Sequence, residues 1–171
     1  DDPDCQNAFK CDDSQGSVGD QIKVDLFLFA FPNQVQGFSM AISHCCEISV
    51  VETLDITDTI LEAIGAEFVS VRGDNDPDDG DGCETIVGVL IDALPPFDGA
   101  TIPPLPQFQK VGTLCYDVTD DQDACGTVCP LEFVDGLDGP GKVPVKNLVS
   151  VSNESLNVQI LNCQVTIVGR E

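Results

Sequence analysis

Residues 21–31 read QIKVDLFLFAF, and this stretch sets the class of fold that the chain adopts. Apolar residues occupy every second position from Ile22 to Leu28, which is the period of a β-strand that buries one face. From Phe27 to Phe31 the opposite face becomes apolar as well. We therefore expect a central strand that is covered on both sides at its end.

Further strand-like segments follow, separated by turn clusters rich in Gly, Pro and Asp. They cover residues 35–43, 47–54, 66–71, 85–91, 111–118, 130–134, 143–150 and 156–168. The one helical candidate, Thr57 to Ile64, is short. About nine short strands with turns between them predict an all-β sandwich with at most one short helix. We expect an N-terminal segment, 1–17, followed by one sandwich domain, 18–171.

The charge balance is strongly acidic, with 30 Asp and Glu residues against 7 Lys and Arg, a net charge of -23. Phosphate backbones are bound by Lys and Arg, so this balance excludes nucleic acid as the expected partner. It also disfavours anionic membrane surfaces. The sequence contains no run of about 18 apolar residues, so we expect no membrane insertion.

Nine cysteines indicate either disulfides or metal ligands. Zinc sites use CxxC pairs with histidines, whereas this chain has no CxxC pair and only one histidine, His44. The sequence therefore predicts disulfides, formed in an oxidising extracellular or cell-surface location. A first residue of Asp1 rather than Met also favours a secreted, processed chain. The nine are Cys5, Cys11, Cys45, Cys46, Cys83, Cys115, Cys125, Cys129 and Cys163.

Short loops close easily, so two local disulfides are expected, Cys5–Cys11 and Cys125–Cys129. The other five cysteines fall near predicted strand ends. For these we expect Cys45 or Cys46 to join Cys83, Cys115 or Cys163. Because nine is an odd number, one thiol is left over or bonded to another chain.

Two acidic loops are candidate Ca²⁺ sites, and Ca²⁺ is the one cofactor that the sequence suggests. In the first, Asp74, Asp76 and Asp78 match the first three ligands of an EF-hand, but Asp79 stands where that loop needs Gly and Glu84 misses the twelfth position by one. An irregular calcium site and a solvated acidic turn both remain open. The candidate ligands are Asp74, Asp76, Asp78, Asp79 and Asp81. The weaker second set is Asp117, Asp120, Asp121 and Asp123.

Catalytic chemistry has little support in the residues. A Cys–His nucleophile needs a free thiolate beside the base, and the neighbours of His44 are cysteines expected to be bonded. The chain has no Trp and a single Tyr116, which disfavours a glycan platform built on flat aromatic rings. Asn153-Glu154-Ser155 is an N-glycosylation sequon in a predicted turn. We expect a binding protein with no enzymatic activity.

The order of segments resembles the cohesin domain. Val18-Gly19-Asp20-Gln21-Ile22-Lys23-Val24 is similar to the family's opening strand, and residues 35–43 are similar to its "v.G.qf.l.y" strand. Residues 111–118 and 156–168 resemble its later strands. The resemblance implies a nine-stranded jelly-roll sandwich that receives a dockerin-like protein or a glycan. His44-Cys45-Cys46 departs from the family, which commonly has an Asp after that strand and needs fewer cysteines.

Two functional hypotheses follow. The first is a structural subunit of an extracellular filament or surface assembly, built by head-to-tail contacts between copies, with segment 1–17 packing on a neighbouring subunit. A last strand that finishes at Val168, close to Glu171, favours this hypothesis. The second is a cohesin-type receptor module that binds another secreted protein.

Overall fold

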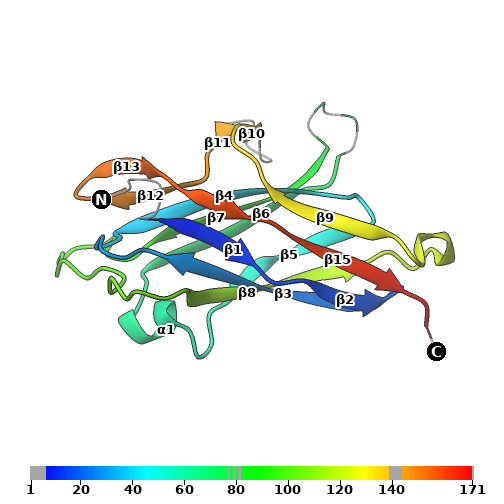
Figure 1. The fold of residues 1–171 in the computed structure, drawn as a ribbon, viewed down its shortest axis with the longest axis horizontal. Coiled ribbons are helices and arrows are strands. Elements are labelled where there is room, and N and C mark those ends of the chain that lie inside the picture. Colours follow the sequence, from blue (N-terminus) through cyan, green and yellow to red (C-terminus); the bar gives the residue numbers. More distant parts are fainter. Residues whose placement is uncertain (1–6, 77, 79, 81, 139–143, 171) are drawn as a thin grey trace.

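Two β-sheets pack face to face in a sandwich (Figure 1). The structure is a computed structural model and describes residues 7–76, 78, 80, 82–138 and 144–170. The fifteen strands of the described residues are β1 Ala8–Cys11, β2 Ser14–Ser17, β3 Gln21–Phe29, β4 Gly37–His44, β5 Ile48–Asp55, β6 Phe68–Asp74, β7 Cys83–Leu90, β8 Gln109–Val118, β9 Val128–Phe133, β10 Leu137–Asp138, β11 Pro144–Val145, β12 Leu148–Val151, β13 Glu154–Asn157, β14 Gln159–Leu161 and β15 Cys163–Val168. The predicted all-β sandwich is confirmed.

One sheet has five strands in the order β14-β1-β3-β8-β5. The other has eight strands, in which β6, β7 and β4 lie side by side and β4 is followed by β9, β15 and β2. Strand β12 also pairs with β4, and β13 pairs with β12. Strands β10 and β11 form a separate two-stranded ribbon. The central strand β3 lies between β1 and β8, and its pairing with β8 contains an irregularity between Leu26 and Phe27.

The core lies between the two sheets and takes every second residue of the long strands. All four inward residues of β3 are fully buried: Ile22, Val24, Leu26 and Leu28. The outward face is covered only in part, because Phe27 and Phe29 are half-buried and Phe31 is exposed. The expectation of a strand covered on both sides was therefore wrong for its outer face.

The segment before residue 18 belongs to the sandwich. Strand β1 pairs with β3 in one sheet, and β2 pairs with the last strand, β15, in the other. The ring of Phe9 is fully buried and packs near the rings of Phe38 and Phe133. The expected boundary at residue 18 therefore does not separate residues 8–17 from the sandwich, whereas residues 1–6 lie outside the described part.

The predicted helix is shorter than expected. Helix α1 spans Ile60–Ile64 and ends at Gly65, whose φ of 71° is a left-handed conformation that favours glycine. Leu61 is its buried residue and anchors it to the core. Among the described residues, no helix is long and apolar enough to cross a membrane.

Candidate functional site

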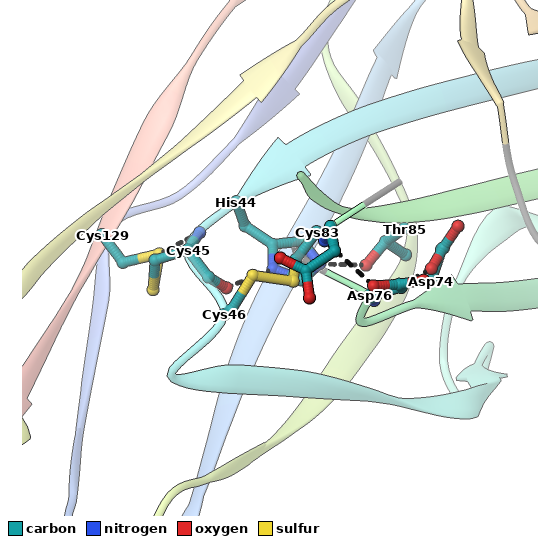
Figure 2. The surroundings of a disulfide bond; sticks show 9 residues. His44, Cys45, Cys46, Asp74, Asp76, Cys83, Thr85 and Cys129 are labelled. Carbon is teal, nitrogen blue, oxygen red and sulfur yellow. Dashed lines mark hydrogen bonds between the residues drawn. A yellow bond between two sulfur atoms is a disulfide. The ribbon is translucent and has the colours of Figure 1, made fainter. Parts of the chain in front are cut away.

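Two disulfides hold the end of strand β4 to both of its neighbours. Cys45 is bonded to Cys129 on β9, and the adjacent Cys46 is bonded to Cys83 on β7 (Figure 2). A third bridge, Cys11–Cys163, joins β1 of one sheet to β15 of the other. These cross-links fix strand ends that are far apart in sequence.

Both local disulfides expected from the sequence are wrong. Cys11 is bonded to Cys163 rather than Cys5, and Cys129 is bonded to Cys45 rather than Cys125. The reason is side-chain direction, because Cys11 and Cys129 are buried in the sandwich and face Cys163 and the half-buried Cys45.

One expected longer-range pairing, Cys46 with Cys83, is confirmed. Within the described residues, Cys115 and Cys125 are free thiols rather than the disulfide cysteines we expected. Cys115 is half-buried on the outer face of β8, and burial raises the pKa of its thiol. Cys125 is exposed, and Cys5 lies outside the described residues.

Beside the paired disulfides, a buried chain of hydrogen bonds connects the two sheets. The Oγ1 atom of Thr85 on β7 lies 3.0 Å from Nε2 of His44 on β4 and 3.0 Å from the hydroxyl of Tyr116 on β8. The Nδ1 atom of His44 lies 2.8 Å from the carbonyl oxygen of Cys45. Since a carbonyl only accepts, Nδ1 carries the proton and donates to Cys45.

This tautomer fixes the direction of the other two bonds. In a neutral ring Nε2 then accepts, so the Thr85 hydroxyl donates to His44 and the Tyr116 hydroxyl donates to Thr85. Burial lowers the pKa of His44, which favours the neutral imidazole. Burial also raises the pKa of Tyr116, which keeps its hydroxyl protonated. His44 is thus occupied by structural hydrogen bonds, and the single tyrosine is too deeply buried to serve as a glycan platform.

The first acidic loop folds its carboxylates back onto its own backbone. Asp74 Oδ1 accepts from the Asp76 backbone at 3.0 Å, and Asp76 Oδ1 accepts from the Asp78 backbone at 2.9 Å. Such turns are a common use of Asp in loops. Asp79 and Asp81, two of the five candidate ligands, lie outside the described residues.

Two carboxylates of the second acidic set also accept hydrogen bonds from within the chain. Asp117 is on β8 and accepts from Gln21 Nε2 at 2.9 Å, whereas Asp121 caps a short 3-10 turn at Gln122–Ala124 through the Asp123 backbone. Across the part of the chain that the structure describes, no three His, Cys, Asp or Glu side chains are grouped to hold a metal ion. Calcium binding at either loop stays a prediction.

The sequon asparagine is accessible. Asn153 is exposed in the turn between β12 and β13, where its φ of 63° is left-handed, and its backbone N–H donates to Gln36 Oε1 at 2.9 Å. Its side chain is not used by this bond. Glycosylation at Asn153 therefore stays a prediction on an exposed turn.

A nearly uncharged surface lies on the outer face of β6 and β7. We call it the β6–β7 stripe, and its residues are Phe68, Ser70, Arg72, Ile86, Gly88 and Leu90. Phe68 and Leu90 are opposite each other in register and are 48% and 47% exposed. Arg72 is the single charged residue of the stripe, in a chain with 30 acidic residues. The stripe thus combines two exposed apolar side chains with one cation.

A groove of about 390 Å³ borders the stripe where the two sheets meet. Its walls are Val69–Arg72 of β6 and Glu52–Leu54 of β5. Among the described strands, β6 pairs only with β7, so its other backbone edge faces this groove. An added Cβ on Gly73 would lie 2.6 Å from a methyl carbon of Val50, so the groove closes at that end.

The sequence itself carries a signal for the stripe. Phe68 and Leu90 fall on the outward positions of strands whose inward positions, Val71 and Val89 among them, are already apolar. Apolar residues on both faces of a strand indicate a second contact surface when no further layer of the fold covers it. The strand pattern alone does not say whether a further layer covers the outer face of these strands.

No protein-family model matches the chain, and no curated protein matches it in sequence. Solved structures match its fold over nearly the whole length. The sixth cohesin of scaffoldin B from Acetivibrio cellulolyticus, in complex with a Cel5 dockerin, has a TM-score of 0.64 and 10% identity, covering 95% of this chain and 99% of that one. The OlpA cohesin from Clostridium thermocellum, also in a dockerin complex, has a TM-score of 0.61 and 14% identity, covering 95% and 99%.

A third match is a non-cellulosomal cohesin from the archaeon Archaeoglobus fulgidus, with a TM-score of 0.57 and 12% identity, covering 98% of this chain and 94% of that one. The chain therefore has a cohesin-like fold, as its segment order suggested. With identities this low, the likeness is one of fold and fits a divergent cohesin-like domain, which in this chain carries three disulfides.

Proposed function

We propose that the chain is a secreted, non-enzymatic protein-interaction module whose partner docks on the β6–β7 stripe. The observation that carries the proposal is that exposed Phe68 and Leu90 share with Arg72 a stripe whose six residues include no carboxylate. The centres of protein interfaces are enriched in aromatic residues and Arg and depleted in Asp and Glu. On a molecule with a net charge of -23, such a surface is a favourable place for a protein to bury apolar area.

The groove beside the stripe supports the same proposal. The free edge of β6 presents backbone N–H and C=O groups to any chain that enters the groove. Hydrogen bonds to a strand edge are a recurrent way of binding an extended segment. A partner that packs on Phe68 and Leu90 would therefore have a second, directional set of contacts within reach.

The fold relatives add support from analogy, since two of the cohesin structures described above hold a dockerin protein. Fold alone does not define a function, so the weight rests on the stripe. The three disulfides favour an oxidising, extracellular or cell-surface location. In the filament hypothesis the partner at the stripe is the next copy of the chain, and in the receptor hypothesis it is a different secreted protein.

A photo-crosslinker at the stripe tests the proposal. Benzoylphenylalanine replaces Phe68 in one variant, and in a matched control it replaces Leu161, which is 49% exposed on the edge strand of the other sheet. We expect irradiation in the native extracellular medium to give one defined protein adduct with the first variant only. Mass spectrometry identifies the adduct as this chain or another protein. Equal or no adducts from the two variants contradict the proposal.

Affinity gives a second readout. Once the partner is identified, Phe68→Glu is expected to weaken binding at least tenfold, since it places a carboxylate at the centre of the contact. Leu161→Glu changes the charge equally and is expected to leave the affinity unchanged. Negative-stain microscopy then decides between the two hypotheses, because only the filament subunit forms polymers.

A further inference from the structure

The outer face of the five-stranded sheet, on the opposite side of the molecule from the β6–β7 stripe, carries its charges in four rows that run across the strands. In the first row Lys10, Phe27 and Lys110 are in register on β1, β3 and β8. The first row contains Lys10 and Lys110, and the second contains Asp12, Asp25 and Asp55. The charged residue of β3 in the third row is Lys23, and that of β8 in the fourth row is Asp117. On β1, β3 and β8 the sign of the charge alternates from each row to the next.

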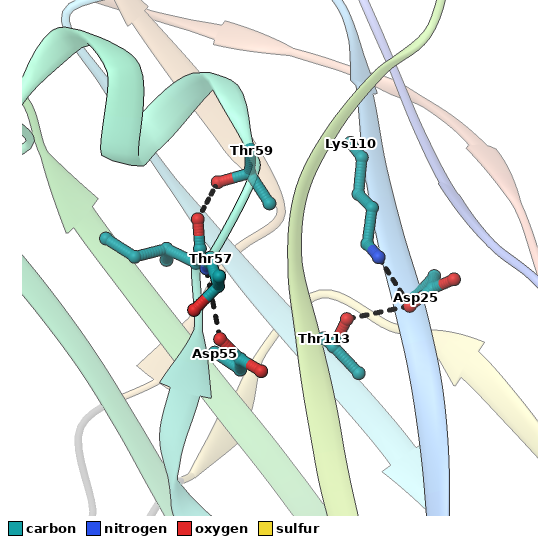
Figure 3. A network of polar contacts seen from close by, with 7 residues as sticks. Asp25, Asp55, Thr57, Thr59, Lys110 and Thr113 are labelled. Carbon is teal, nitrogen blue, oxygen red and sulfur yellow. Dashed lines mark hydrogen bonds and ion pairs between the residues drawn. The ribbon is translucent and has the colours of Figure 1, made fainter.

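Short contacts hold the first two rows in place. Lys110 Nζ lies 3.2 Å from Asp25 Oδ1, and the Thr113 hydroxyl donates to the same oxygen at 2.7 Å. Figure 3 shows both side chains pointing at Asp25. Lys10 Nζ lies 3.6 Å from Asp12 Oδ1. All these groups remain partly exposed, so they are ordered without being withdrawn from the surface.

This face departs from the charge of the whole molecule. Lys10, Lys23 and Lys110 are three of the seven basic residues in the chain, and they nearly balance the acidic side chains of the four rows. Half-buried Phe27 and Phe29 add apolar area between and beside the lysines. Over the molecule as a whole the excess of carboxylates opposes close approach of two copies, whereas on this face the repulsion is largely cancelled.

We infer that a second copy of this chain docks on the four charged rows, sheet against sheet, about a twofold axis. The axis lies in the contact plane, parallel to the rows and between the second and third. Rotation then places the Lys10–Lys110 row over the Asp117 row of the second copy, and the Asp25 row over its Lys23 row. Every row meets one of opposite sign, so the face is complementary to itself. A two-residue step along a strand is about 6.8 Å, so adjacent rows remain distinct charges at contact distance.

Charge alternation is the reason to name a second copy as the occupant. A twofold axis makes the surface contact itself, so residues on one side of the axis meet residues on the other. Alternating rows satisfy this condition without any further match, whereas a different protein would need its own rows with the same spacing. Facing sheets pack about 10 Å apart, which leaves room for interleaved Lys and Asp side chains.

Sedimentation of the purified full chain over a range of concentrations tests the inference. We expect a monomer–dimer equilibrium for the wild type at about 0.15 M salt, where pairs in close contact are screened less than distant charges. Lys23→Glu makes the third row negative, so that it faces the Asp25 row of the second copy, and is expected to raise the dimer dissociation constant at least tenfold. Lys146→Glu makes the same charge change at an exposed site off this face and is expected to leave it unchanged.

A mixing experiment makes the test specific to the geometry. Asp25→Lys alone sets positive charge against Lys23 and is also expected to weaken the dimer. In a mixture of Lys23→Glu and Asp25→Lys the altered rows face each other, so heterodimers are expected to form where each variant alone is monomeric. Circular dichroism confirms that both variants fold, and Lys23→Gln serves as a milder substitute if one does not.

Four results overturn the inference: a wild type that stays monomeric, a dimer insensitive to Lys23→Glu, equal weakening by Lys146→Glu, or no dimer on mixing the folded variants. The test is independent of the proposed function. Phe68→Glu, on the other sheet, is expected to weaken partner binding at least tenfold and leave the dimer unchanged. Loss of the dimer on Phe68→Glu would place self-association at the stripe instead.

Discussion

The ring of Tyr116 stands edge-on to the imidazole of His44, with ring centroids 5.2 Å apart and ring planes at 76°. The first residue belongs to the five-stranded sheet and the second to the eight-stranded sheet. Thr85 bridges their polar atoms, so ring packing and hydrogen bonding act between the same two side chains. This contact fixes how the sheets sit against each other at the disulfide-rich end.

Folding stability is expected to fall when His44 is forced to take a proton. Its pKa is lowered in the fold, mainly by burial, so below about pH 6.5 the unfolded chain binds the proton more readily than the native one. The stabilisation is therefore complete above the unfolded pKa and is lost as the pH falls toward the folded pKa. Urea unfolding from pH 7.5 to 5 measures this slope.

His44→Gln is the control for this pH dependence, because the amide keeps a polar group at the site and does not titrate. The difference in unfolding free energy between wild type and variant removes the contribution of the many carboxylates. We expect this difference to shrink as the pH falls below about 6.5. A difference that stays constant with pH would contradict the lowered pKa.

Tyr116→Phe is expected to destabilise the fold by about 1 kcal/mol, the usual net value of a hydrogen bond. The ring and its packing against His44 remain, while Thr85 loses its donor. Thr85→Val removes both hydrogen bonds and leaves His44 Nε2 without a donor in a buried site, so we expect a larger loss, roughly 1–3 kcal/mol. Equal stability of wild type and Tyr116→Phe in denaturant titrations would argue against the bond.

The Cys11–Cys163 bridge closes a loop with a sequence separation of 152 residues. A joint Cys11→Ser and Cys163→Ser variant is expected to lose roughly 2–5 kcal/mol of stability. Cys125→Ser, at an exposed free thiol, is expected to stay within about 0.5 kcal/mol of the wild type. A non-reducing peptide map that recovers Cys5–Cys11 or Cys125–Cys129 would contradict the structure.

Calcium is expected to raise the melting temperature if the first acidic loop binds it. A ligand that binds only the native state adds RT ln(1 + [L]/Kd), about 2.7 kcal/mol at a hundredfold excess over Kd. Asp76→Asn with Asp78→Asn is expected to remove the rise, and Asp120→Asn with Asp121→Asn is the matched change in the second loop. Identical melts with Ca²⁺ and with chelator would leave both loops as solvated turns.

The sequence predicted best the strands in which apolar and polar residues alternate over many positions. Residues 21–31 show it most clearly, and β3 has the expected inward residues. Strands β1 and β2 were missed because each has four residues, too few to show alternation. Their parallel partners, β14 and β15, lie about 150 residues further along the chain. Local sequence carries no information on such pairing.

The disulfides and the four charged rows were harder to predict for a related reason. Proximity in sequence favoured Cys125 as the partner of Cys129, but β9 turns Cys129 inward and the loop leaves Cys125 outside. The charge rows depend on the register between β1, β3 and β8, which hydrophobic alternation does not specify beyond the choice of face. Composition predicted the acidic surface, and only the fold shows where its few lysines gather.

The bridge between Cys11 and Cys163 also determines how the molecule carries mechanical tension. A force applied between points outside the bridge passes through one sulfur–sulfur bond and bypasses both sheets. Of the described residues, only 7–10 and 164–170 can then be drawn out, because the loop between the two cysteines is closed covalently. Strands β1 and β15 have most of their residues outside that loop, so they are the elements that a pulling force would peel away first. Under load the rest of the sandwich behaves as an inextensible link.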